Sequence, residues 1–488
     1  MKKIYSYLVL GILLLSVSSC REDYLETVPT DTISSESIVE TADNMMLSIN
    51  GMHRSMYTRQ NRNQGQSGQS GIMIMLDALG EDVVFTTTGN GWFVSTVRWL
   101  DQQNENSSNM LYPWRFYYML IRNANVLING GQNASGSEVV KRNALGQAYA
   151  FRAFSHFQLV QLYASRYDGT PNAKGIPLRL EANDDPLARS SVEEVYKQIN
   201  LDLDKSLELL TGVTRVHKSH FDVNVVRGLK ARVAMVLGNY EVAAEQARLA
   251  RQGYALMDNG TYLSGFNKLD NNEWIWGSQI REDQTALFAN FGAFMSRNFN
   301  STNIRQNPKA MNTLLYRKFP KTDVRTQVVD ETGAHVGLGL ARNFSKYPYT
   351  SQKFLSVSSG DSRMDVPYMR AAEMYLIEAE ALARAGREVE SKVVFTEFSK
   401  NRNPQYVETA SVGAAYITEI LDSRRIELWG EGFRFLDLKR LNMPLDRNGA
   451  NHSSVVINNI FDVPAGDSKW TFLIPRRELN SNTLLEQN

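Results

Sequence analysis

The chain has a single cysteine, Cys20, in 488 residues. One thiol cannot form a disulfide within the chain, so packing and polar contacts have to hold the fold together. Long apolar runs are also absent, because no stretch reaches the roughly 20 apolar residues that a helix needs to cross a bilayer. Hydrophobic residues nevertheless make up 43% of the chain, which is ample for a packed core. The sequence therefore predicts a globular body without disulfides.

An excess of charge of either sign is missing as well. Lys and Arg number 53 against 52 Asp and Glu, and without the first 19 residues, which carry Lys2 and Lys3, the balance is 51 against 52. Proteins that bind nucleic acid through charge show a basic stripe or a high pI. We therefore expect no nucleic-acid partner.

The common catalytic motifs do not occur. The chain has no Walker A loop, His-Glu-x-x-His, Gly-x-Ser-x-Gly or dinucleotide-binding glycine pattern. The nearest approach to a metal pair is His217 and His220, and without a third ligand nearby a solvated turn is preferred to a zinc site. No spacing singles out a carboxylate pair for glycoside hydrolysis. The missing motifs argue weakly against an enzyme, and the sequence predicts no cofactor.

What the chain does have begins with an export signal. Two lysines precede the short apolar stretch 8–15, and small residues lead up to Cys20. This order is that of a secretory signal peptide, and it resembles a lipobox, in which the thiol after the cleavage site receives lipid. Residues 1–19 are predicted to be a lipoprotein signal peptide and Cys20 the lipid attachment site. Residues 20–35 are predicted to be a tether and an extended N-terminus.

Helical patterns dominate the rest of the chain. Apolar residues recur at helical spacing over residues 37–57, 109–129, 139–167, 191–210, 222–238, 240–251, 368–386, 388–401 and 422–440. Ser191 and Glu194 form a Ser-x-x-Glu box at a helix start. Around Gly238 and Gly386, a helix with small residues, a glycine turn and an amphipathic helix follow one another, as in tetratricopeptide-like hairpins. The predicted fold class is mostly α, built of such hairpins.

Two regions lack helical periodicity. Residues 60–108 and 256–364 are loop-rich, and residues 60–71 are predicted to be a polar loop. The one clear strand candidate is Glu273–Ile280. Long loops inside a compact chain are usually functional. We therefore expect one domain, 36–488, with a helical scaffold at about 36–57, 109–255 and 365–442 and a ligand-binding region in the loops.

Aromatic residues in the first loop region suggest a binding site. Trp92, Phe93 and Trp99 lie there among Asn90, Arg98 and Asp101. A tryptophan can cover the apolar face of a sugar ring, while amide, carboxylate and guanidinium groups bracket its hydroxyls. The combination would suit a peptide nearly as well. Trp92 is predicted to be exposed, whereas Trp99 is equally consistent with a buried anchor.

The segment Asp422–Arg440 is dense in charge and aromatic residues. It predicts two helices that meet at Gly430-Glu431-Gly432. Charges that can pair across helical turns are Arg424, Arg425, Glu427, Glu431 and Arg434. Such a cluster could form a catalytic or anion site, but a partly buried ion-pair network is the preferred interpretation.

The same segment carries a family resemblance. Residues 424–440, RRIELWGEGFRFLDLKR, resemble the C-terminal signature of the SusD/RagB family, and the resemblance extends through residues 368–386, YMRAAEMYLIEAEALARAG, and over most of the chain. Members are lipid-anchored nutrient-binding proteins of Bacteroidetes outer membranes. The resemblance implies a cell-surface location, a helical-hairpin scaffold and a SusC-like TonB-dependent transporter as partner. Some relatives hold structural calcium, and the sequence does not show whether this chain binds a cation.

The resemblance also implies where the ligand binds. The family's sites lie in N-terminal loops, joined by loops of the central region, to which this chain contributes Tyr262, Phe288 and Phe291 by location and residue type. The function that follows is capture of an oligosaccharide at the cell surface and its delivery to the transporter. The alternatives are the same transport role with peptides and, third, a surface glycan-degrading enzyme. The resemblance argues strongly against the third, so no enzyme is predicted.

Overall fold

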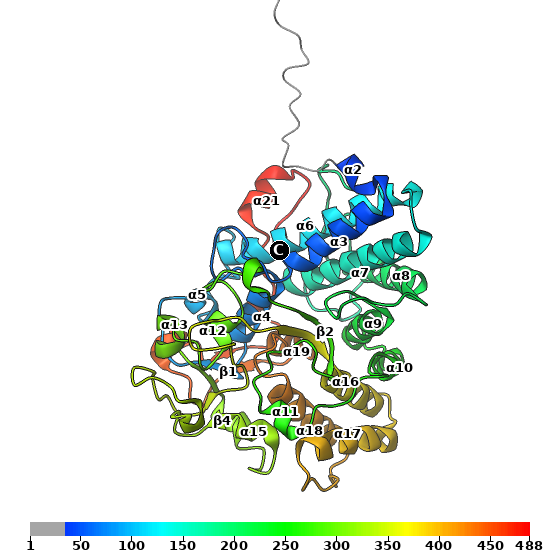
Figure 1. Ribbon diagram of the computed structural model, residues 1–488. Coiled ribbons are helices and arrows are strands. Elements are labelled where there is room, and N and C mark those ends of the chain that lie inside the picture. The colour runs from blue at the N-terminus through cyan, green and yellow to red at the C-terminus, as the bar shows by residue number, and fades with distance from the viewer. Residues whose placement is uncertain (1–34) are drawn as a thin grey trace, which may run out of the picture.

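The computed structural model describes residues 35–488 (Figure 1). The predicted signal peptide, Cys20 and most of the tether lie outside the described residues. The longer helices are α2 Ser35–Glu40, α3 Ala42–Ser55, α4 Gly68–Leu79, α6 Ser108–Gly130, α7 Glu138–Tyr163, α8 Val192–Leu210, α9 Val223–Leu237, α10 Tyr240–Ala250, α16 Ala371–Arg384, α17 Glu388–Arg402, α18 Gly413–Glu427 and α19 Arg434–Arg440. The prediction of a mostly α fold is confirmed.

The remaining elements are short. The strands are β1 Val83–Phe85, β2 Trp274–Ser278, β3 Lys309–Met311, β4 Val329–Asp330, β5 Thr350–Ser351, β6 Val366–Arg370, β7 Leu445–Asp446 and β8 Asp462–Val463. They form a four-stranded sheet in the order β1-β3-β5-β4 and two antiparallel pairs, β2-β6 and β7-β8. The short helices are α5 Val94–Val97, α11 Asn259–Tyr262, α12 Gly292–Met295, α13 Thr302–Gln306, α14 Thr313–Tyr316, α15 Val324–Gln327, α20 Ser454–Ile457 and α21 Arg476–Ser481. The predicted strand at 273–280 is confirmed as β2.

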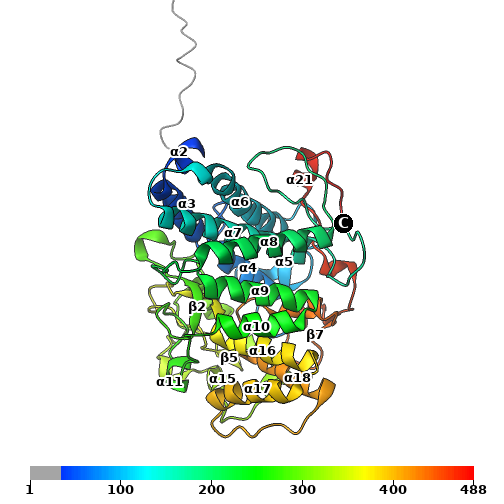
Figure 2. The ribbon, with the colours of Figure 1, turned by 90° about the vertical axis from the view of Figure 1, so that its right-hand side faces the viewer.

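The molecule has a helical side and a loop-rich side. Figure 2 shows the helices stacked from α2 at the top to α17 and α18 at the bottom, while the short elements gather on the other side in Figure 1. In the stack, α9 and α10 form one hairpin and α16 and α17 the next. The turn glycines Gly238 and Gly386 have φ of 72° and 80°, the left-handed region that side chains with a Cβ rarely adopt. The helical-hairpin prediction is therefore confirmed at both positions.

Two predictions near the N-terminus need correction. The expected helix 37–57 is interrupted at Thr41, whose hydroxyl accepts a hydrogen bond from Asn44 N at 3.1 Å and so caps the start of α3. The polar tract 60–71 is not wholly a loop, because α4 begins at Gly68. This helix is buried on all sides, and neighbouring groups satisfy its polar residues, as where Tyr117 Oη donates to Gln69 Oε1 at 2.7 Å.

A buried ion-pair network joins the two sides of the molecule. Arg370, at the end of β6, donates to both oxygens of Glu431 at 2.9 and 2.6 Å and to Glu427 at 2.9 Å. Arg402 of α17 donates to Glu427 at 3.0 Å and to Glu273 at 2.7 Å. Each of these residues is at most 5% exposed. The preferred interpretation of the charged segment, a buried network, therefore holds.

The partners in this network differ from the expected ones. The segment's charges pair mainly with residues far away in the chain: Arg425 contacts Asp82 at 2.6 Å and Arg434 contacts Glu81 at 2.8 Å. Lys353 donates to Glu431 at 2.6 Å. Among Arg424, Arg425, Glu427, Glu431 and Arg434, no two pair with each other in the described structure. Pairs across turns within the segment form with its aspartates instead, Arg425 with Asp422 at 3.3 Å and Arg440 with Asp437 at 2.8 Å. The network thus mainly stabilises the packing of separate elements against one another, and not a single helix.

Candidate functional site

A small cavity lies under the loop between β1 and α6. Its volume is about 180 Å³, and its lining includes Asn63, Gly65, Gln66, Trp92, Phe93, Ser95 and Asn109. The cavity therefore gathers two of the aromatic residues predicted for ligand binding and several amides that the sequence analysis did not assign. The sequence analysis did not consider the amides of residues 60–66 as ligand contacts, because it expected only a polar loop there. The high amide content of this tract is the signal that could have indicated such a role.

One wall of the cavity is aromatic. Trp92 and Phe93 are half-buried and stand edge-on to Phe294, with ring centroids 5.7 and 5.4 Å apart. Gly65 lies against both rings, since a Cβ there would be 3.3 Å from Trp92 Cε3 and 3.5 Å from Phe93 Cζ. Phe294 belongs to α12 in the central region. The structure thus brings the N-terminal loop and the central region together at this point, as the sequence analysis expected.

The polar rim offers both a donor and an acceptor. Asn63 accepts a hydrogen bond from Gly65 N at 2.9 Å through Oδ1, and its Nδ2 has no partner within residues 35–488. Asn109 donates from Nδ2 to Asp101 at 2.9 Å, which leaves its Oδ1 without a partner in the same range. A carboxamide nitrogen donates and its oxygen accepts. Together they match the two hydrogen-bonding roles of a hydroxyl group.

The backbone around the aromatic wall is strained. Phe93 and Trp99, which flank α5, have φ of 61° and 54°. A bulky residue in this region costs on the order of 1–3 kcal/mol, and such residues persist only where surrounding structure holds them. Strain of this kind is concentrated at ligand sites. It therefore supports a functional interpretation of the loop.

Asp101 does not face the cavity as a ligand residue would. Its carboxylate is 6% exposed and accepts hydrogen bonds from Ser95 Oγ at 2.8 Å, Thr96 Oγ1 at 2.6 Å and Ser107 Oγ at 2.8 Å, besides Asn109. These contacts tie α5 to the start of α6. The prediction that Asp101 contacts the ligand is corrected, because its oxygens are used to shape the loop that presents Trp92.

Trp99 and Arg98 also hold the loop in place through contacts with other parts of the chain. Trp99 is 3% exposed, donates from Nε1 to Leu79 O at 3.1 Å and stacks edge-on against Trp470 at 4.8 Å. Its placement among the ligand residues is therefore corrected, and the alternative of a buried anchor is the one observed. Arg98 donates to the carbonyls of Val455 and Val456, each at 3.0 Å. Those contacts direct its guanidinium toward α20.

Of the central-region candidates, two are buried. Tyr262 is 1% exposed and lies under the Arg402 guanidinium, 5.0 Å from the ring centroid. Phe291 is 1% exposed and packs edge-on against Phe354 at 5.0 Å. Both predictions are corrected, because these rings cover the buried network and its surroundings. Phe288 is 49% exposed, and Asn90 is exposed at the turn before Trp92. Both remain accessible.

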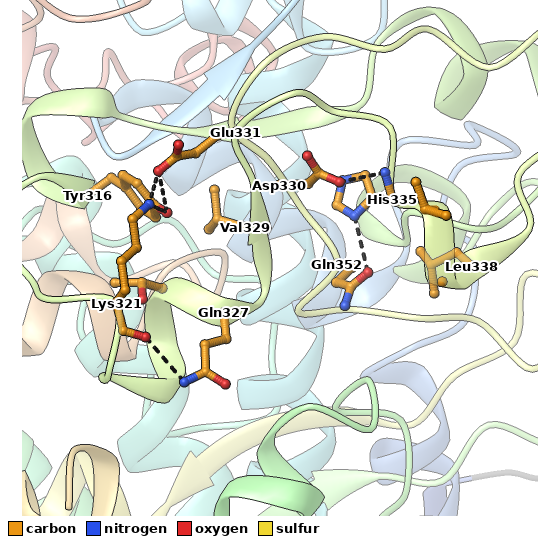
Figure 3. Close-up of a pocket in the computed structure, with 12 residues that line it drawn as sticks. Tyr316, Lys321, Gln327, Val329, Asp330, Glu331, His335, Leu338 and Gln352 are labelled. Carbon is orange, nitrogen blue, oxygen red and sulfur yellow. Dashed lines mark hydrogen bonds and ion pairs between the residues drawn. The ribbon is translucent and has the colours of Figure 1, made fainter.

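A larger groove lies elsewhere, between the 316–321 segment and the loop that follows β4. Its volume is about 600 Å³ (Figure 3). Its polar groups are used on one another: Lys321 pairs with Glu331, Asp330 accepts from His335 N at 2.6 Å, and His335 contacts Gln352 at 3.1 Å. Its one aromatic residue, Tyr316, is 5% exposed. Size alone therefore does not make it the better ligand site.

Within residues 35–488, no three His, Cys, Asp or Glu side chains are placed to hold a metal ion. The rings of His217 and His220 are 6.4 Å apart on a half-buried turn. In the same part of the chain, no helix is long and apolar enough to span a membrane.

Comparison with protein families accounts for nearly the whole chain. Residues 23–235 match a SusD-like model described as "Starch-binding associating with outer membrane", and residues 250–488 match the SusD/RagB model of the SusD family. The chain belongs to the SusD/RagB family. The resemblance carried by residues 368–386 and 424–440 is thereby confirmed.

Curated members of the SusD/RagB family resemble the chain at low identity. SusD-like protein P38 of Formosa agariphila is 24% identical over 391 residues, which cover 70% of this chain and 74% of the relative. SusD-like protein P2 of the same organism is 22% identical over 481 residues, which cover 90% of this chain and 91% of the relative.

Solved structures share the SusD-like fold. A SusD-like carbohydrate binding protein from Bacteroides vulgatus superposes with a TM-score of 0.80 at 23% identity, covering 91% of this chain and 97% of that one. A laminarin binding SusD-like protein gives 0.67 at 19% identity, with 92% and 99% covered. Surface glycan-binding protein A from Bacteroides fluxus gives 0.69 at 18% identity, with 92% and 99% covered. At these identities the likeness shows the fold.

Proposed function

We propose that this protein binds oligosaccharides at the cavity formed by Trp92 and Phe93. The observation that carries the proposal is the half-buried aromatic wall beside the amide nitrogen of Asn63 and the amide oxygen of Asn109, which have no partner within residues 35–488. An aromatic ring covers the apolar face of a sugar, and a donor and an acceptor beside it bracket the hydroxyls. Relatives named for carbohydrate, laminarin and glycan binding support this ligand class.

The protein acts, in this proposal, as a binding component of nutrient uptake and not as an enzyme. Lipid on Cys20 holds it at the outer surface of the outer membrane, where it delivers the oligosaccharide to a SusC-like TonB-dependent transporter. The family description of association with the outer membrane supports the location. Purification from membranes through a tag on this chain is expected to retain a large outer-membrane transporter. A Cys20→Ala variant that stays in the membrane fraction would contradict the anchor.

Trp92→Ala tests the ligand class and the site together. Isothermal titration of residues 21–488 against panels of oligosaccharides and peptides is expected to give heat with a glycan. Because the variant loses an apolar platform worth about 1.5–3 kcal/mol, its Kd for that glycan should be about 10- to 100-fold weaker.

Tyr240→Ala is the matched control, since this half-buried aromatic starts α10 on the helical side. It should leave the Kd unchanged. If only peptides give heat, the ligand is a peptide and not a glycan, and the transport role stays the same. Glycan binding that Trp92→Ala leaves intact would move the site to another part of the loop region.

A further inference from the structure

A second groove lies between α3, the turn at residues 215–221 and the segment that follows β2. Its volume is about 540 Å³, and its lining includes Arg54, Tyr57, His220, Gln279, Arg281 and Gln284. No aspartate or glutamate is among the described residues that line it. The groove therefore differs from the one in Figure 3, whose lining carries two acidic side chains.

Two arginines in the groove have no partner within residues 35–488. The guanidinium groups of Arg54 and Arg281 are exposed, and neither forms an ion pair or hydrogen bond with another residue of the described chain. Both nevertheless lie near the Tyr57 hydroxyl: burial raises the pKa of Tyr57, the charges of Arg54 and Arg281 oppose that rise, and the charge of the nearby Asp283, which does not line the groove, adds to it more weakly. Most arginines of the fold's interior are paired, as Arg370 and Arg402 are. Two unpaired guanidiniums beside one hydroxyl point to a negatively charged ligand.

The amides of the groove are arranged as donors. Gln284 Oε1 accepts from Tyr57 Oη at 2.6 Å, Gln279 Oε1 contacts His217 Nε2 at 3.2 Å, and Asn50 Oδ1 contacts His220 Nε2 at 2.8 Å. Each amide oxygen is thereby used within the groove. Each amide nitrogen has no partner among the described residues. The groove thus offers N–H donors and positive charge with few acceptors, the complement of a carboxylate or sulfate.

The groove and the Trp92 cavity are connected by a short stretch of chain. One connecting segment serves both, because Tyr57 lines the groove and Asn63 lines the cavity. Six residues of fully extended chain span at most about 22 Å, which is the upper limit of their separation. The segment that carries Arg281 also leads on to the exposed Phe288.

We propose that this groove binds the acidic substituent, a carboxylate or sulfate, of a negatively charged oligosaccharide held at the Trp92 cavity. The proposal rests on the proposed glycan function and adds the charge of the ligand to it. Arg54 and Arg281 supply charge-assisted hydrogen bonds, and the free amide nitrogens complete the contacts to the anionic oxygens.

The test compares three oligosaccharides: an oligogalacturonate, its methyl-esterified form and a sulfated oligosaccharide. Each is titrated into residues 21–488 of the wild type and of the variant Arg54→Gln/Arg281→Gln. One of the two acidic ligands is expected to bind more tightly than the neutral ester, and which one binds tells a carboxylate site from a sulfate site. The double variant should bind that ligand about 100-fold more weakly, at roughly tenfold per charge-assisted contact.

Arg59→Gln is the matched control, because Arg59 is exposed on the same segment and does not line the groove. It should leave binding unchanged, and an unchanged melting temperature of the double variant shows that the fold is intact. Binding of both acidic ligands no tighter than that of the neutral ester, or acidic binding that the double variant retains, would overturn the groove while leaving the glycan function standing. Failure of every saccharide to bind would overturn both.

Discussion

Glu427→Gln is expected to lower the free energy of unfolding by about 3–5 kcal/mol. The wild-type carboxylate is fully buried between Arg370 and Arg402, with contacts at 2.9 and 3.0 Å. The amide keeps the shape but removes a negative charge, which leaves Arg370 with Glu431 and Arg402 with Glu273 and the buried cluster short of one compensating carboxylate. Breaking a buried pair typically costs this much. Chemical denaturation of residues 21–488 measures the change.

Arg387→Ala is the control for this prediction. Arg387 forms exposed pairs with Glu390 at 2.5 Å and Glu241 at 2.8 Å. Exposed pairs contribute about 0–1 kcal/mol, so the variant should unfold nearly as the wild type does. Equal effects of the two substitutions would contradict the claim that the buried network, and not charge pairing in general, holds the loop-rich side to the helical side.

Acid is expected to unfold the protein between about pH 4 and pH 2. Burial alone would raise the pKa of Glu427, but Arg402 and Arg370 hold it well below its usual value. Burial also favours a higher pKa for Asp437, but the charges of Arg424 and Arg440 have the larger effect and lower this pKa to about 2. A group with a depressed folded pKa contributes stability above its unfolded pKa of about 4, and this contribution is lost as pH falls toward the folded pKa.

Each such group removes about 1.4 kcal/mol per pH unit once the pH is below its unfolded pKa. Asp77 acts in the opposite direction, because burial raises its pKa. Melting temperatures at pH 7, 4, 3 and 2 check the window, and Glu427→Gln should show a shallower loss than the wild type because one of the depressed groups is gone. A melting temperature that stays level down to pH 2 would contradict the prediction.

The helical scaffold could be predicted because its signals are local. Ser191 and Glu194 form the expected capping box, with the Ser191 hydroxyl accepting from Glu194 N at 3.1 Å. Glycine at 238 and 386 marks both hairpin turns by itself. In contrast, α4 was not recognisable from residues 60–71, because its polar side chains are satisfied by groups such as the Tyr117 hydroxyl, which lies 48 residues away in sequence.

The site was only partly predictable for the same reason. Trp92 and Trp99 occupy one loop and look alike in sequence, yet Trp99 is buried by Trp470 and Phe435 from the C-terminal region. Tyr262 is covered by Arg402 in the same way. Burial of a loop aromatic depends on residues distant in the chain, so composition could indicate the loop but not which of its rings reaches solvent.

The most direct test of the glycan site fills the cavity without removing its rings. Gly65→Leu places a side chain against Trp92 and Phe93, because a Cβ added at Gly65 would lie 3.3 and 3.5 Å from them. Isothermal titration of this variant, with the oligosaccharide that the wild type binds, is expected to show no heat at a melting temperature close to that of the wild type. Binding of the glycan with wild-type affinity by the folded variant would contradict the assignment of the site to this cavity.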